Sequence, residues 1–209
     1  MMPEYRSLVV LGDDLYADIV TSYLAVQLKP YNITLHRILS LSESNETLIK
    51  ADHSIHALNQ ELGLDFTQLM HEGILLPELV SEYHIGDSTV LFESFPHLKD
   101  DLPIPSYQIM MRLFKEGIVT DLSAQSPLIA LHRAKKFHPQ LHRFYRGDLR
   151  PYGANLQVSA YSKLLREIAL RYSVNFIETK NLDIVLTNGI IDSVGLQEGY
   201  ALKNSFFID

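Results

Sequence analysis

The residues best placed to do chemistry lie in the turn that follows an apolar run near the N-terminus. In the stretch VVLGDDLYAD, Gly12, Asp14 and Ala17 occupy the places at which a dinucleotide-binding turn carries its three glycines. Alanine is tolerated at the third place, whereas Asp14 puts a carboxylate where a diphosphate would rest on the helix N-terminus. The pattern therefore predicts the strand, turn and helix of a nucleotide-binding sheet, with weak binding of the nucleotide.

Two interpretations of Asp13 and Asp14 are open. In the first, the carboxylates cap the helix, where they accept hydrogen bonds from free amides and oppose the helix dipole by about 0.3–1 kcal/mol. In the second, they close the pocket to phosphate, because like charges about 4 Å apart repel by about 1–4 kcal/mol, depending on the local dielectric constant. Both interpretations predict weak dinucleotide binding.

Two strands and a helix must position this turn. The apolar run from Leu8 to Leu11 is typical of a strand covered on both faces. We expect the following helix to turn its apolar residues toward the sheet, namely Leu15, Ile19, Tyr23, Val26 and Leu28. A short second strand is expected from Asn32 to Leu35. His36 and Arg37 then stand where a dinucleotide fold has the acidic residue that binds the adenosine ribose.

Composition limits the classes of protein. The chain has 209 residues, of which 46% are hydrophobic, which is enough for one sizeable core. Its net charge of −7 disfavours nucleic-acid binding, since nucleic-acid-binding proteins usually need a basic surface. The absence of cysteine excludes disulfides and thiolate chemistry. No apolar run approaches the length of a membrane span, so we expect a cytoplasmic protein with no membrane partner.

The middle of the chain is expected to be irregular between about residues 73 and 150. Before it, the apolar spacing predicts a short helix that stops at Gly63, and Asp65 is expected to cap another. His53 and His56 could share a helical face, but without a third ligand we expect solvent-facing or capping histidines and no metal site. The region from Gly73 to Pro105 is expected to contain short strands, with a hairpin near residues 90–92.

Two helices are predicted inside this irregular region. Ser106 is expected to cap a helix that runs to about Glu116. Its buried stripe is expected to hold Ile109, Met110, Leu113 and Phe114. Ser126 and Pro127 begin the second helix.

A basic segment follows from Leu131 to Arg150, in which Asp148 is the only acid. Its basic residues are Arg133, Lys135, Lys136, Arg143, Arg146 and Arg150. It is either a solvated loop or a docking surface for an acidic partner or a phosphorylated ligand. His138 and His142 have the spacing of zinc ligands, but the surrounding cations disfavour a metal there.

The last quarter of the chain carries the most specific pattern. A helix is expected from Ser159 or Ala160, with its apolar residues at helical spacing, and a strand from Asn175 to Ile177. Three further strands are expected at residues 182–186, 190–196 and 200–208, separated by the turns Asn188-Gly189 and Glu198-Gly199. This predicts a three-stranded meander before a last strand that returns to the central sheet.

The block YGANLQVSAYSKLLREIALRYSVNFIE, followed by DIVLTNGIIDSVGLQEGYALKNSFFID, resembles the flavin-dependent tryptophan halogenases, which share the fold of flavoprotein monooxygenases. Weaker similarity extends backward through SPLIALHRAKKF and HALNQELGLDFTQLM to the first strand and helix. The resemblance implies an α/β fold with a Rossmann-like, FAD-binding-type parallel sheet, flanking helices and a C-terminal three-stranded β-meander. It implies a single domain over residues 1–209 that is incomplete relative to the family.

The family's cofactor-binding positions carry over as a degenerate set. Gly12 matches the first flavin glycine, and Asp14 and Ala17 replace the next two. Arg37 stands about where the ribose-binding acid belongs. FAD is therefore the cofactor that the resemblance implies, and its binding is expected to be lost or weakened.

The family's catalytic lysine, which passes the activated halogen from flavin to substrate, falls at Glu78 in PELVSEY. No lysine occurs between Lys50 and Lys99, and the family's tryptophan-containing motif is absent from a chain with no tryptophan. A carboxylate offers neither an amine nor a cationic donor. No catalytic residue is therefore predicted.

These observations leave three hypotheses. The first is a halogenase-like protein without catalysis that serves as a binding or partner subunit, for example of a full-length halogenase homologue. The second is a halogenase or monooxygenase-type oxidoreductase that binds FAD in an altered mode or with a partner chain. The third is a remnant or fragment that forms a homo-oligomer through an open sheet edge.

Overall fold

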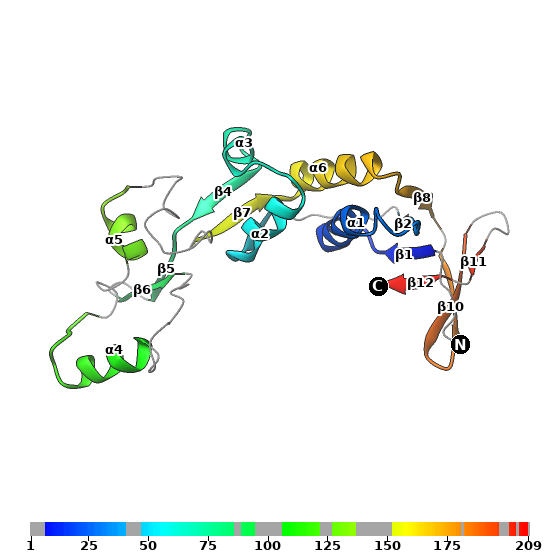
Figure 1. The fold of residues 1–209 in the computed structure, drawn as a ribbon. Helices are drawn as coiled ribbons and strands as arrows, with labels where there is room; N and C mark the ends of the chain where they lie inside the picture. The colour runs from blue at the N-terminus through cyan, green and yellow to red at the C-terminus, as the bar shows by residue number, and fades with distance from the viewer. Residues whose placement is uncertain are drawn as a thin grey trace. The chain divides into compact units, whose positions relative to one another are not determined.

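The structure, a computed structural model, describes residues 7–40, 47–85, 89–94, 106–121, 127–136, 152–180, 182–196, 201–203 and 205–208 (Figure 1). The chain divides into two compact units. Unit 1 comprises Met1–Leu48 and Gln157–Asp209, and unit 2 comprises Ile49–Leu156. Among the described residues, no helix is both long and apolar enough to cross a lipid bilayer.

Unit 1 is built on a parallel sheet with the strand order β12-β1-β2-β8. The strands are β1 (Ser7–Leu11), β2 (Thr34–Ser40), β8 (Asn175–Thr179) and β12 (Phe206–Ile208). Helix α1 (Leu15–Gln27) connects β1 to β2, and helix α6 (Val158–Arg171) leads into β8. The predicted Rossmann-like α/β sheet is therefore confirmed.

Alternating side chains of the parallel sheet serve two separate cores. On one face, Val10 and Leu35 pack with Ala17 and Ala25 of α1 and Ala169 of α6. On the other face the sheet contacts the meander, through the buried residues Val9, Leu11, Ile38, Val194 and Leu202. Both faces of the sheet are covered, as the apolar run of β1 predicts.

The expected buried stripe of α1 is wrong in part. Tyr23 is 39% exposed, and the buried face of the helix carries mainly small and polar residues, namely Leu15, Ala17, Asp18, Thr21, Ser22 and Ala25. Small side chains let α1 approach the sheet and α6 closely. Because these residues are no more hydrophobic than those on the exposed face, the apolar pattern of the helix does not identify its buried face. The predicted stripe of α6 is confirmed by buried Tyr161, Leu165 and Ile168, although the helix begins at Val158.

The C-terminal meander is confirmed as a three-stranded antiparallel sheet, β9 (Asp183–Thr187), β10 (Ile190–Gly195) and β11 (Ala201–Lys203). The prediction of one last strand from residue 200 to 208 is wrong, because β11 ends at Lys203 and β12 pairs with β1. Ser205, between them, is buried, and its hydroxyl lies 2.5 Å from that of Ser7. This contact holds the crossover onto the parallel sheet.

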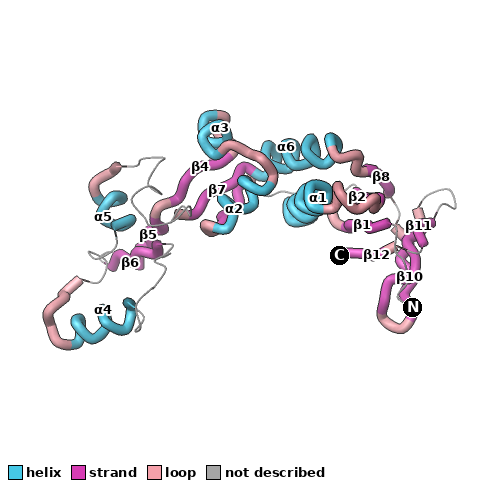
Figure 2. Tube along the Cα trace, in the orientation of Figure 1, coloured by secondary structure: helices cyan, strands magenta, loops and turns pink. Residues whose placement is uncertain are grey.

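Unit 2 contains short elements (Figure 2). Strands β3 (Leu48–Ala51), β7 (Gly153–Gln157) and β4 (Leu75–Glu78) form one sheet, and β5 (Val80–Ile85) and β6 (Thr89–Ser94) form the expected hairpin. The helices are α2 (Ser54–Glu61), α3 (Phe66–His71), α4 (Ser106–Lys115) and α5 (Pro127–Arg133). The predicted cap of α3 is confirmed, since Asp65 Oδ1 accepts a hydrogen bond from the Gln68 amide at 2.8 Å. Strands β3 and β7 were not predicted.

Two expectations in unit 2 are wrong. Ile109 and Phe114 of α4 are exposed by 39% and 44%, because an amphipathic pattern identifies an apolar face without supplying a partner for it. His56 is buried and not solvent-facing, since its Nε2 lies 2.9 Å from the Tyr152 carbonyl oxygen and its ring packs edge-on against Phe66.

Several predictions lie outside the described residues. They concern the basic segment beyond Lys136 with His138 and His142, and the turn Glu198-Gly199. Within the described part of the basic segment, Arg133 pairs with Asp121 at 3.3 Å, and Lys135 and Lys136 are exposed.

His36 makes the stability of unit 1 depend on pH. Burial lowers the pKa of His36 below its ordinary value of about 6.5, and its Nδ1 has no hydrogen-bond partner among the described residues. On acidification the unfolded chain binds a proton at His36 before the folded chain does, so the free energy of unfolding falls as the pH falls through the ordinary value. We expect His36→Gln to lose less stability than wild type between about pH 7 and about pH 5, measured by urea unfolding. Equal losses in the two proteins would contradict this assignment.

Candidate functional site

The turn between β1 and α1 has the conformation that a glycine-containing nucleotide turn requires. Gly12 has a φ of +117°, a region that residues with a side chain rarely adopt. A Cβ atom at Gly12 would lie 3.4 Å from the Ala17 Cβ and 4.0 Å from Arg37 Nη1. The first position of the fingerprint therefore keeps both its backbone conformation and its close packing.

Asp14 is the N-cap of α1. Its backbone is extended, and its Oδ1 accepts a hydrogen bond from the Ala17 amide at 2.9 Å. The capping interpretation is confirmed for Asp14. Its exposed carboxylate thus uses a free amide of the helix N-terminus, the group that would otherwise receive an anion.

Arg37 lies inside a strand and not near its end, because β2 extends to Ser40 rather than stopping at Leu35. Since alternate residues share a face, Arg37 points to the same side as Leu35, toward α1. Its side chain is fully buried. Nη1 donates a hydrogen bond to the Gly12 carbonyl oxygen, and Nη2 donates to Asp18 Oδ1 at 3.4 Å. Arg37 thus holds the turn from beneath and does not present its guanidinium to solvent.

Asp18 joins two guanidinium groups. Its side chain is 1% exposed and accepts hydrogen bonds from Nε of the half-buried Arg166 at 3.1 and 3.0 Å, in addition to the contact with Arg37. Burial lowers the pKa of Arg37 from its ordinary value, and the Asp18 carboxylate opposes that shift. An arginine remains protonated in such a site. The three residues therefore form a buried arginine–aspartate–arginine network behind the turn.

Asp18 and Arg166 were missed by the sequence analysis. A signal for Asp18 was present, since an acid three residues after Leu15 falls on the same face of the helix. Arg166 offers no comparable signal, because it lies on a different helix far along the chain.

The residues of this turn do not fit the diphosphate of a dinucleotide. At the helix N-terminus a carboxylate stands where the diphosphate would rest, and like charges at about 4 Å repel by about 1–4 kcal/mol. Arg37 is inside β2 and fully buried, so it does not occupy the place at the strand end where the ribose-binding acid is expected. Ala17 is compatible with the fold, since the helix packs closely on the strand there.

Glu78 belongs to unit 2 and is the last residue of β4. Its Oε1 lies 3.2 Å from Lys50 Nζ and accepts a hydrogen bond from the Ser81 hydroxyl at 2.6 Å. Lys50 Nζ also donates to the Ser81 hydroxyl. An ammonium group therefore lies beside the Glu78 carboxylate, supplied by β3. The sequence did not indicate this pairing, because the two strands are distant in the chain.

The structure thus brings Gly12, Asp14, Ala17 and Arg37 together in unit 1. Within the part of the chain that is described, no group of three or more histidine, aspartate or glutamate side chains is arranged to hold a metal ion. At the turn, the Asp14 carboxylate caps the helix N-terminus, and the network of Arg37, Asp18 and Arg166 lies behind it.

Known structures share this architecture. The chain is similar to BrvH, a flavin-dependent halogenase from Brevundimonas sp. BAL3, with a TM-score of 0.74 and 16% identity over 96% of this chain and 41% of that one. It is similar to Xcc4156, a flavin-dependent halogenase from Xanthomonas campestris, with a TM-score of 0.77 and 16% identity over 98% and 42% of the two chains. The tryptophan halogenase of Shewanella frigidimarina NCIMB 400 gives a TM-score of 0.75 and 15% identity over 100% and 43%.

No protein-family model and no curated protein sequence matches the chain. At this level of identity, the similarity to solved structures establishes the fold. The chain spans about two fifths of the length of those halogenases. Over that span, it has the α/β fold of the flavin-dependent halogenases.

Proposed function

We propose that this chain is a halogenase-fold protein that neither binds flavin through its βα turn nor halogenates, and that it acts as a non-catalytic binding or partner subunit. The observation that carries the proposal is the Asp14 carboxylate on the Ala17 amide at the N-terminus of α1. A cofactor diphosphate would need that place and would meet a fixed negative charge in it. The buried Arg37 is consistent with the proposal, because its guanidinium is engaged by the Gly12 carbonyl oxygen and Asp18 and is not available to a cofactor.

Glu78 argues against halogenation independently of the turn. The family resemblance places the halogen-carrying lysine at this position, and a carboxylate cannot form a bond to halogen through nitrogen or donate a cationic hydrogen bond. The chain thus lacks the family's expected groups both in the βα turn and at the lysine position. The two losses together support a non-catalytic protein more strongly than either loss alone.

A second candidate is an enzyme that holds flavin in an altered mode or with a partner chain. The Lys50 ammonium, 3.2 Å from Glu78 Oε1, favours it, since a cation remains beside the expected lysine position. In this candidate Lys50 would take the role of the missing lysine, so its removal would abolish any activity.

A halogenation assay separates the two candidates. The chain is supplied with a flavin reductase, FAD, NADH, bromide and tryptophan, and the products are read by mass spectrometry with the tryptophan halogenase of Shewanella frigidimarina NCIMB 400 as the assay control. We expect no brominated product from wild type, because neither the turn nor Glu78 provides the required groups. Brominated product that disappears in Lys50→Met would contradict the proposal and support the second candidate.

A further inference from the structure

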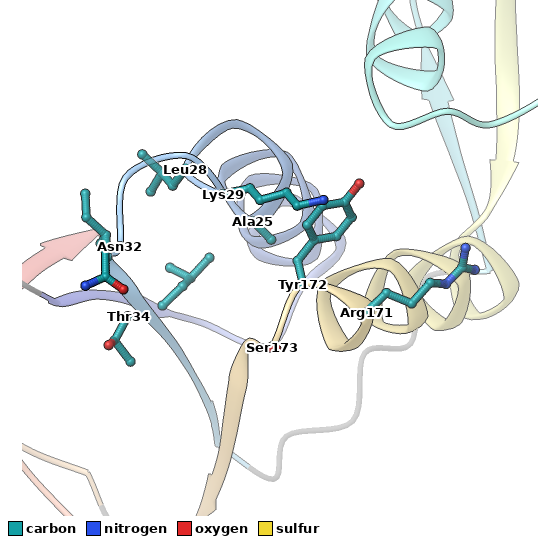
Figure 3. Close-up of a pocket in the computed structure, with 10 residues that line it drawn as sticks. Ala25, Leu28, Lys29, Asn32, Thr34, Arg171, Tyr172 and Ser173 are labelled. Atoms are coloured by element: carbon teal, nitrogen blue, oxygen red, sulfur yellow. The ribbon is translucent and has the colours of Figure 1, made fainter.

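Unit 1 contains a pocket at the end of the parallel sheet opposite to the Gly12 turn. It lies where α1 and α6 end and where β2 begins, and its cavity volume is about 340 Å³ (Figure 3). The turn follows the carboxyl end of β1, whereas the pocket adjoins Thr34, the first residue of β2. Because β1 and β2 are parallel, the turn lies at the carboxyl ends of these strands and the pocket lies at their amino ends. The pocket is therefore independent of the flavin-type site and of the function proposed for it.

Part of the pocket lining is apolar. Ala25 and Leu35, which line it, are 6% and 5% exposed and belong to the core between the sheet and the helices. Leu28, at the end of α1, is half-buried and extends this surface. Asn32 and Thr34 add an amide and a hydroxyl at the rim. The cavity can therefore cover the apolar body of a ligand and offer hydrogen bonds at its mouth.

The charged groups of the pocket are cations. Lys29 Nζ lies 5.3 Å from the centre of the Tyr172 ring, and Figure 3 shows the two side chains next to each other. Arg171 lines the same pocket. Neither cation forms an ion pair with a described carboxylate, and none of the described residues that line the pocket is acidic. In a chain with a net charge of −7, a pocket with two cations and no acid favours an anion.

The helix ends limit the charge of that anion. The carboxyl ends of α1 and α6 both border the pocket, and each carries the equivalent of about half a negative charge. Together they offset about one of the two positive side-chain charges. The remaining potential suits a single negative charge better than the two charges of a phosphate monoester.

We propose that this pocket binds a small organic monocarboxylate with an apolar body, whose carboxylate pairs with Lys29 while its body lies on Leu28 and Leu35. A volume of about 340 Å³ is at the lower end of small-molecule sites, which suits a ligand the size of an aromatic acid. The Tyr172 ring beside Lys29 adds an aromatic wall to the carboxylate end of the site.

Benzoate is a suitable probe, and ¹H–¹⁵N NMR of the full chain is a suitable measurement. We expect saturable shifts at the amides of Leu28, Lys29, Tyr172 and Ser173, with a dissociation constant in roughly the millimolar range. At the same ionic strength, neutral benzamide and inorganic phosphate are expected to bind about tenfold more weakly or not at all. The benzamide comparison needs no variant, so the test does not depend on the folding of a mutant.

The variant Lys29→Met should weaken benzoate binding by about tenfold, because it removes the charge and keeps an unbranched side chain. Lys163→Met is the matched control, since Lys163 is an exposed lysine on α6 outside the pocket. The affinity of this variant for benzoate should equal that of wild type. Equal shifts with benzamide, stronger binding of phosphate, unchanged affinity in Lys29→Met or shifts confined to other residues would each overturn the proposal.

Discussion

Replacing Asp18 with alanine is expected to lower the free energy of unfolding by about 3–5 kcal/mol. The Asp18 carboxylate lies 3.4 Å from Nη2 of Arg37, whose side chain is fully buried, and it opposes the effect of burial on that guanidinium more strongly than Asp13 does. Without it, the guanidinium would remain charged in a site with little access to water. Arg166 would lose its partner too, but its side chain is 39% exposed and can turn to solvent. Urea unfolding followed by circular dichroism measures the change.

Two further variants isolate the buried charge as the cause. The double variant Asp18→Leu with Arg37→Met removes both charges and keeps apolar volume, so it should be much less destabilised than Asp18→Ala. Glu167→Ala is the matched control, because Glu167 is an exposed acid on α6, and it should change stability by no more than about 0.5 kcal/mol. A loss below about 1 kcal/mol in Asp18→Ala would show that Arg37 is not held as described.

Replacing Asp14 with glycine is expected to raise the affinity of the chain for ADP by about tenfold or more. The substitution frees the Ala17 amide and removes a repulsion of about 1–4 kcal/mol, which corresponds to a factor of about five to several hundred. Glycine is itself a tolerated N-cap, so the stability cost should be a few tenths of a kcal/mol. Isothermal titration calorimetry with ADP, which carries both the diphosphate and the adenosine ribose, measures the change.

Asp65→Gly is the matched control for this prediction. Asp65 caps α3 as Asp14 caps α1, with its Oδ1 2.8 Å from the Gln68 amide, but it lies in unit 2. The same loss of charge and cap there should leave ADP affinity unchanged. If Asp14→Gly bound ADP no better than wild type, the carboxylate would not be what excludes the diphosphate.

Local patterns predicted those parts of the fold that depend on local physics. The apolar run of β1, the cap at Asp14 and the Asn188-Gly189 turn each specify their own conformation, so β1, the start of α1 and the β9–β10 hairpin were predicted correctly. The left-handed conformation of Gly12 also follows from its place in the fingerprint.

What the sequence could not show were contacts between distant segments. Arg37 looked like a degenerate ligand position, and only the pairing of β2 with β1 reveals that it is buried beneath the turn. Lys50 is distant from Glu78 in sequence, and the sheet β3-β7-β4 brings the two together. The helix α1 packs through small residues such as Ser22 and Ala25, so hydrophobic periodicity predicted its buried face only in part.

The most direct test of the closed turn is a titration of FAD into the wild-type chain, followed by flavin fluorescence, with Asp14→Gly measured in parallel. Because the carboxylate at the helix N-terminus opposes the diphosphate, wild type should give no saturable change, whereas Asp14→Gly should give a measurable one. Tight, stoichiometric quenching by wild type would contradict the closed turn, since it would show that flavin binds despite the Asp14 carboxylate.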